Sequence, residues 1–113
     1  MEAEQRRRYL RARVNCRATI RGNHSWVFSV CENISEDGFY IRDMGNEIVG
    51  NSVKIELELP DRDYPLVAEG RVVWRKNNGL RSGGGLVFTR ILKSDRKWLS
   101  DFIDKFAQLN RED

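Results

Sequence analysis

Histidine and cysteine are scarce in this chain of 113 residues, which has one histidine, His24, and two cysteines, Cys16 and Cys31. No Cys-x-x-Cys pair is present, so a zinc site lacks ligands. With a single histidine, no Gly-x-Ser-x-Gly nucleophile elbow and no metal-ligand cluster, the sequence predicts neither an enzyme nor a cofactor. We expect both thiols to be reduced and structural.

Long apolar runs are also missing. No run approaches the ~20 residues that span a bilayer, and residues 1–8 are polar and lack the apolar core of a signal peptide. The composition, 40% hydrophobic and 33% charged, is typical of a soluble globular protein, and the length suits one domain. The sequence therefore predicts a cytoplasmic domain, or part of a larger cytoplasmic chain, with no membrane insertion.

Excess charge is absent from most of the chain. The net charge is +3, and residues 1–13 alone hold five arginines against two glutamates, so the other residues balance at 15 basic and 15 acidic. A uniformly basic surface would suggest nonspecific binding of nucleic acid. A single basic arm on a neutral body instead indicates a local anionic partner.

Alternation of apolar and polar residues predicts six short strands. They cover residues 14–21, 25–31, 39–42, 52–59, 66–76 and 84–90. Residues expected to share one face include Cys16, Ala18 and Ile20 in the first strand, Trp26, Phe28 and Val30 in the second, Phe39 and Ile41 facing inward in the third, and Leu66, Ala68, Val72 and Trp74 in the fifth. Successive short strands of this kind are typical of an antiparallel barrel.

The period changes after residue 92. Ser94 suits a helix cap and Asp95 its first turn, and the apolar residues then recur at three- and four-residue spacing. They are Trp98, Leu99, Phe102, Ile103, Phe106 and Leu109. We therefore predict an all-β fold with a C-terminal helix: a flexible Arg-rich arm over residues 1–13, a small six-stranded antiparallel β-barrel over 14–92, and an amphipathic helix over 93–113.

Two stretches do not fit a core. The arm, residues 6–11, is rich in arginine, whose guanidinium forks onto phosphate or onto O6 and N7 of guanine and also stacks on a base. The turn, residues 33–38, places donors and acceptors of Asn33 and Ser35 on one side, and Gly38 leaves room for a base or ribose. Taken alone, each stretch also suits a solvated tail or an ordinary turn.

Together, the two stretches resemble the PilZ domain family, which is marked by an Arg-x-x-x-Arg arm and an Asp/Asn-x-Ser-x-x-Gly turn. Here these are Arg7-Arg8-Tyr9-Leu10-Arg11 and Asn33-Ile34-Ser35-Glu36-Asp37-Gly38. Residues 70–74 and 84–88 are similar to the family's last two barrel strands, so the resemblance covers nearly the whole chain. It implies a split-barrel fold and a bacterial receptor for the second messenger cyclic di-GMP.

The resemblance also implies roles for single residues. Arg7 and Arg11 would grip guanine and phosphate, Asn33 and Ser35 would hydrogen-bond the guanine edge or the ribose, and Gly38 would leave room. Asn33 stands where many relatives have Asp, so the carboxylate is lost while donor and acceptor capacity remain.

Three further residues follow from the same resemblance. Arg6 lies just before the Arg7/Arg11 pair, and an arginine there resembles the version of the motif that binds an intercalated ligand dimer. Arg8 is an additional candidate contact. Trp74 lies where some relatives stack an aromatic ring on guanine, although its alternation with Val72 equally suits a core position.

The expected mechanism is ordering of the arm. Residues 1–13 bury little apolar surface, so ligand contacts would fold them over the barrel and change a surface that an effector protein recognises. Two alternatives stay open: a β-barrel that binds oligonucleotides on aromatic platforms, which is not the partner we expect, and a PilZ-like module that binds only protein.

Overall fold

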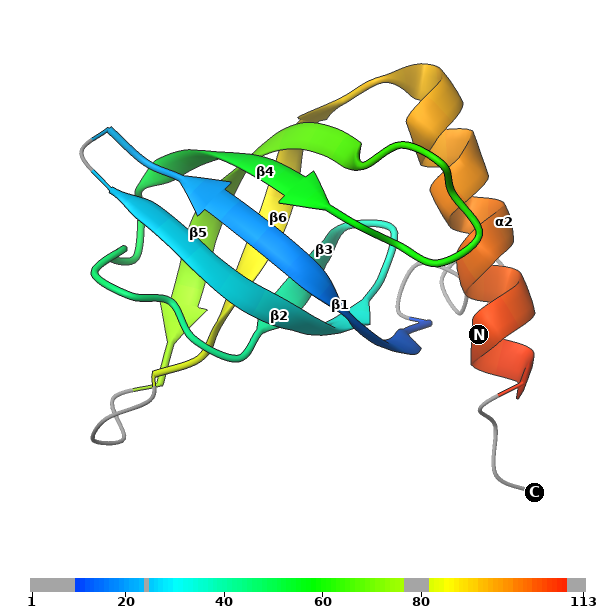
Figure 1. Cartoon of the computed structure of the whole chain (residues 1–113), viewed down its shortest axis with the longest axis horizontal. Coiled ribbons are helices and arrows are strands. Elements are labelled where there is room, and N and C mark those ends of the chain that lie inside the picture. The colour runs from blue at the N-terminus through cyan, green and yellow to red at the C-terminus, as the bar shows by residue number, and fades with distance from the viewer. Residues whose placement is uncertain (1–9, 24, 77–81, 110–113) are drawn as a thin grey trace, which may run out of the picture.

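Six antiparallel strands close into a barrel in the order β1-β2-β3-β6-β5-β4, and helix α2 follows the last strand (Figure 1). The structure is a computed structural model that describes residues 10–23, 25–76 and 82–109. Its elements are β1 (Ala12–Arg21), β2 (Trp26–Ile34), β3 (Gly38–Ile41), β4 (Ser52–Leu57), β5 (Leu66–Arg75), β6 (Gly84–Ile91) and α2 (Lys93–Leu109). The predicted fold class is confirmed.

The barrel interior is filled by the inward residues of each strand. Alternation in β4 buries Val53, Ile55 and Leu57, and alternation in β1 buries Ala18 and Ile20. The largest fully buried side chains elsewhere are Ile34, Phe39, Ile41, Met44, Leu66, Val72, Leu86, Leu99 and Ile103. Closing the sheet leaves none of these six strands with an unpaired edge.

Helix α2 lies across one end of the barrel (Figure 1) and adds Leu99 and Ile103 to the core. It begins at Lys93, so Ser94 lies inside the first turn and is not the cap that the sequence suggested. Asp95, also in the first turn, pairs with Arg62 of the β4–β5 loop at 3.2 Å. Within the described ranges, no helix is long and apolar enough to cross a membrane.

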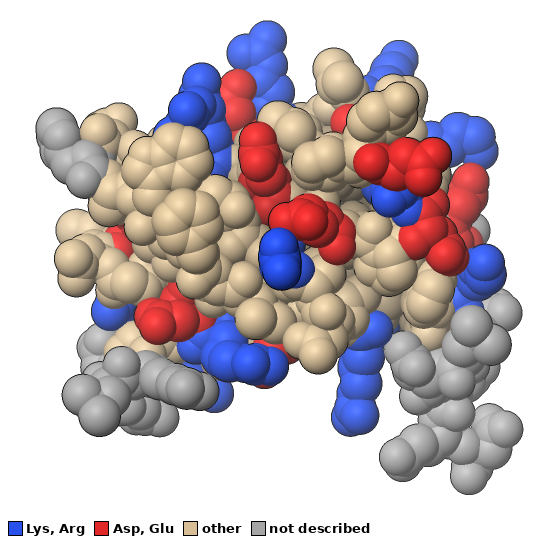
Figure 2. Space-filling view, in the orientation of Figure 1, with Lys and Arg blue, Asp and Glu red and all other residues tan. Residues whose placement is uncertain are grey.

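The outer face of β2 carries an exposed aromatic pair. Trp26 and Phe28 do share a face, as alternation predicted, and it is the outer one because Val27 and Cys31 point into the core. Their rings stack with centroids 6.1 Å apart, and the Arg21 guanidinium lies 5.2 Å from the Trp26 ring centroid. Elsewhere on this side of the molecule, basic and acidic side chains are interspersed (Figure 2).

Candidate functional site

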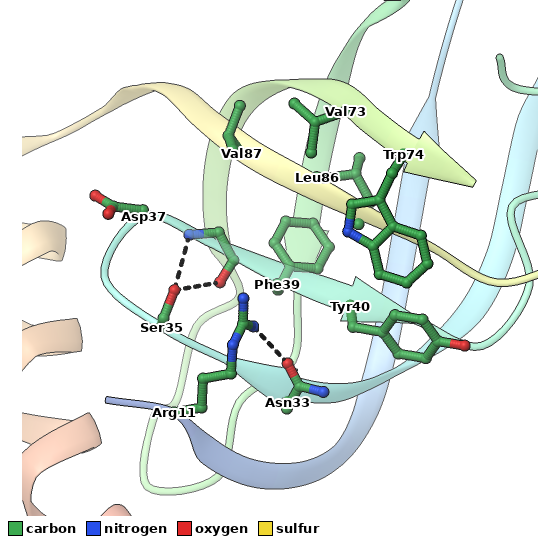
Figure 3. A pocket seen from close by; sticks show the side chains of 12 residues that line it. Arg11, Asn33, Ser35, Asp37, Phe39, Tyr40, Val73, Trp74, Leu86 and Val87 are labelled. Atoms are coloured by element: carbon green, nitrogen blue, oxygen red, sulfur yellow. Dashed lines mark hydrogen bonds between the residues drawn. The ribbon is translucent and has the colours of Figure 1, made fainter. Parts of the chain in front are cut away.

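A cavity of about 310 Å³ opens on the outer surface of the barrel, beside the C-terminal end of β2, strands β3 and β6, and the end of β5 (Figure 3). Five of the residues singled out from the sequence line it: Arg11, Asn33, Ser35, Gly38 and Trp74. The other three, Arg6, Arg7 and Arg8, lie outside the described residues. The arm and the turn therefore meet at one pocket through Arg11.

The meeting point is a hydrogen bond between Arg11 and Asn33. Arg11 Nη1 donates to Asn33 Oδ1 at 2.7 Å, across 22 residues of sequence. The partner is an uncharged amide, so this bond orients the guanidinium without neutralising it. Because Asn33 accepts through Oδ1, the donors of its side chain are the two N–H groups on Nδ2.

Ser35 closes the turn. Its backbone N–H donates to the Gly38 carbonyl at 2.8 Å, its hydroxyl lies 3.2 Å from the same oxygen, and the Gly38 N–H donates to Ser35 Oγ at 3.3 Å. Ser35 is only 4% exposed. These bonds fix the shape of the turn beside the pocket, and hydrogen bonding of Ser35 to a ligand stays a prediction.

The absence of a side chain at Gly38 has a structural reason that the sequence did not reveal. A Cβ built there would overlap the carbonyl oxygen of Leu86 on the neighbouring strand β6. Gly38 pairs with Val87 in that ladder. The glycine is therefore required for β3 to lie against β6, and any further role in leaving room for a ligand stays a prediction.

Irregular pairing aims Asn33 at the pocket. Along β2, Cys31 pairs with Ile41 of β3 and Asn33 pairs with Tyr40, so Glu32 is an extra residue on the β2 side. Without the bulge, Asn33 would follow Cys31 into the core, because residues two apart in a strand share a face. A β-bulge turns the chain locally and redirects the next side chain, and here it turns Asn33 outward.

A second bulge does the same for Trp74. Val72 pairs with Leu86 of β6, while Trp74 pairs with the adjacent Gly85, so Val73 is the extra residue. Val72 stays buried and Trp74 is 44% exposed and lines the cavity. The prediction that Trp74 shares the inward face of Val72 is wrong for this reason.

Tyr40 is a site residue that the sequence reasoning missed. It lines the same cavity and its ring stacks on Trp74, with centroids 5.5 Å apart and an angle of 26° between the planes (Figure 3). Its outward position was available from alternation, because Phe39 and Ile41 on either side face inward. Its contact with Trp74 depends on strand order, which alternation does not give.

Beneath the site, Cys16 and Cys31 are paired across β1 and β2 as buried free thiols. Cys31 Sγ also donates to the backbone oxygen of Asn33 at 3.4 Å. The hydrogen bond with Cys16 and the burial of Cys31 raise the pKa of the Cys31 thiol. The Cys31 sulfur is therefore neutral at physiological pH, while the same hydrogen bond lowers the pKa of the Cys16 thiol.

The pocket thus combines an arginine, an amide and an aromatic face. Such a set suits a ligand with anionic groups and a flat heterocycle, because guanidinium binds phosphate and aromatic rings stack on bases. Metal binding is a different matter: among residues 10–23, 25–76 and 82–109, no group of three or more His, Cys, Asp or Glu is placed to hold an ion.

The closed six-stranded barrel with a pocket between an arm and a turn is the architecture of a PilZ domain. The model of the PilZ domain family matches residues 5–105, and the chain belongs to this family. No curated protein matches the chain in sequence.

Three solved structures share the fold. The Bacillus subtilis inhibitor of motility MotI/DgrA superposes with a TM-score of 0.80 at 20% identity, over 96% of this chain and 54% of that one. The Escherichia coli YcgR PilZ domain with c-di-GMP gives 0.69 at 14% identity over 95% of each chain. Borreliella burgdorferi PlzA in complex with c-di-GMP gives 0.53 at 14% identity, over 100% of this chain and 52% of that one. The chain thus spans about half the length of the MotI/DgrA and PlzA chains.

Proposed function

We propose that the chain is a receptor for cyclic di-GMP, acts in the bacterial cytoplasm and is not an enzyme. The observation that carries the proposal is the bond of 2.7 Å from Arg11 Nη1 to Asn33 Oδ1, which joins the two halves of the motif at one pocket. Membership of the PilZ family and the c-di-GMP complexes of the YcgR domain and PlzA support it.

The chemistry of the pocket matches what this messenger presents: two phosphates and two guanines. Arg11 has five guanidinium N–H donors, and one donor group is used on Asn33, so others remain for a phosphate or for guanine O6 and N7. The Nδ2 donors of Asn33 suit the same guanine acceptors. Trp74 offers a partly exposed indole face on which a base stacks.

The arm is long enough for its remaining arginines to reach the same ligand. Arg7 is four residues before Arg11, a span of at most about 14 Å when extended. We propose that Arg7 contacts guanine or phosphate from the opposite side, that Arg8 assists, and that Arg6 favours an intercalated ligand dimer. Each charge-assisted contact contributes about 1.5–3 kcal/mol.

Ordering of the arm is the proposed output. Fixing a residue costs about 1–2 kcal/mol, which the arginine contacts offset, and the ordered arm would form part of a surface for an effector protein. Amide exchange of residues 5–11 should slow when cyclic di-GMP is added, while exchange in β4 stays the same. Equal protection with and without ligand would remove this part of the proposal.

A calorimetric titration with cyclic di-GMP tests the receptor itself. We expect the native chain to bind, and Arg7→Ala and Arg11→Ala each to weaken binding roughly tenfold or more. Arg96→Ala, an exposed position on α2, is the matched control. Indifference to cyclic di-GMP would overturn the proposal. If the chain instead bound single-stranded nucleic acid with a steep salt dependence, it would be an oligonucleotide-binding barrel.

A further inference from the structure

One row of outward residues crosses four strands of the barrel at the pocket. Asn33 of β2 pairs with Tyr40 of β3, Tyr40 pairs with Gly85 of β6, and Gly85 pairs with Trp74 of β5. The row therefore runs from the amide that Arg11 contacts to the indole face, and only Tyr40 and Gly85 lie between them. Neither residue belongs to the arm or the turn.

Gly85 makes the aromatic contact possible. A Cβ built at this position would overlap the Trp74 indole nitrogen, so the ring lies directly over the glycine backbone. Gly83, two residues earlier, is covered in the same way by the Tyr40 phenol. Because β6 offers no side chain here, rings from the strands on either side of it meet above it and stack at 5.5 Å.

Tyr40 is itself held in place. The Lys76 ammonium lies 5.5 Å from the Tyr40 ring centroid, which is within the range of a cation–π contact. Tyr40 is half-buried, whereas Trp74 is 44% exposed and lines the cavity. The indole of Trp74 is thus held between the Gly85 backbone and the Tyr40 ring.

We propose that Tyr40 is a positioning residue that fixes the Trp74 indole in the orientation in which a flat heterocyclic base stacks on it. The proposal rests on the proposed function for the identity of the ligand, but the stack exists without ligand. An indole that is already oriented loses less side-chain freedom on binding. Tyr40 thereby extends the site from hydrogen bonding at Asn33 to stacking at Trp74.

The ligand-free protein gives the first test. The indole N–H resonance of Trp74, assigned by its loss in Trp74→Phe, should shift in Tyr40→Leu, because the ring current of Tyr40 is removed. Tyr64→Leu, at an exposed tyrosine of the β4–β5 loop, is the control and should leave the resonance in place. Gly85→Ala, which forces the indole away, should shift it as well. An unmoved resonance in both Tyr40→Leu and Gly85→Ala would overturn the proposal.

A double-mutant cycle with cyclic di-GMP gives the second test. Tyr40→Leu should weaken binding roughly three- to tenfold, Tyr40→Phe should bind like the native chain, and Tyr40→Leu should have no further effect in Trp74→Ala. An equal effect of Tyr40→Leu in both backgrounds would show that Tyr40 does not act through Trp74. If the native chain does not bind cyclic di-GMP, the proposed function fails, and the indole resonance still decides whether Tyr40 positions Trp74.

Discussion

Arg11 and Asn33, which are 22 residues apart, are joined by a hydrogen bond of 2.7 Å on the outside of the barrel. Arg11 is the last residue before β1, and Asn33 is the penultimate residue of β2. The antiparallel pairing of these strands places Ala12 opposite Ile34 and Arg13 opposite Asn33. The register of the first hairpin is thus what brings Arg11, the last residue of the basic arm, to the polar turn.

Removing the amide should affect binding more than folding. In Asn33→Ala, Arg11 loses its partner and the pocket loses the Nδ2 donors, so we expect the affinity for cyclic di-GMP to fall roughly tenfold. Calorimetry measures this, with Asn15→Ala on the exposed face of β1 as the control. Equal affinities of the two variants would contradict a role for Asn33 at the ligand.

Gly38→Ala should destabilise the barrel. The added Cβ would overlap the Leu86 carbonyl, and backbone that has to move apart costs about 1–3 kcal/mol. We expect thermal unfolding to show a Tm lower by about 5 °C or more. Glu36→Ala, in the same turn, should leave Tm nearly unchanged. An unaltered Tm for Gly38→Ala would mean that β3 and β6 are not packed as described.

The stability of the docked helix α2 should depend more on the ion pair of Arg62 than on the ion pair of Lys97. Arg62 pairs with Asp95 at 3.2 Å, with side chains 14% and 18% exposed, and its guanidinium lies 4.7 Å from the Trp98 ring centroid. Arg62→Met should therefore lower the free energy of unfolding by about 1–3 kcal/mol.

The matched control is Lys97→Met. Lys97 pairs with Asp101 within the helix, with side chains 80% and 68% exposed, so its loss should change stability by less than about 0.5 kcal/mol. Chemical denaturation of both variants measures the difference. Similar losses for Arg62→Met and Lys97→Met would argue against docking of α2 through Arg62.

Alkaline pH should weaken the fold through Cys31. The pKa of this thiol is raised in the folded state by its hydrogen bond with Cys16 and by burial, above a reference value of 9.0. Its contribution to stability is therefore complete below pH 9 and is lost as the pH rises above that value, because the unfolded chain releases the proton first. Denaturation above pH 9 should show a steeper decline for the native chain than for Cys31→Ala, whereas below pH 9 the lowered pKa of Cys16 acts in the opposite direction. Parallel declines would contradict the raised pKa.

The sequence was sufficient for the strands and for most of the core, because alternation follows from the backbone itself. Val53, Ile55 and Leu57 needed no knowledge of neighbouring strands to be assigned inward. The helix was predicted from its apolar spacing over residues 93–113, and it does begin at Lys93; only the capping role of Ser94 was wrong, since Ser94 is already helical. Local rules therefore worked wherever the pairing is regular.

Alternation failed at one residue of the site, Trp74, whereas Asn33 was assigned to the site from the turn motif and does line the cavity. Glu32 and Val73 are extra residues in their strands, and each reverses the facing of the next pocket residue, Asn33 or Trp74. Alternation cannot predict a bulge, because the position of a bulge depends on the partner strand. The stack of Tyr40 on Trp74 likewise needs β6 to lie between β3 and β5, which is a property of the closed barrel.

The most direct measurement is amide and indole resonance mapping during a titration of the ¹⁵N-labelled chain with cyclic di-GMP. We predict that the largest shifts fall on Asn33, Tyr40 and Gly85 and on the indole N–H of Trp74. Shifts that are absent, or that concentrate instead on Trp26 and Phe28 on the outer face of β2, would contradict a messenger site at this pocket.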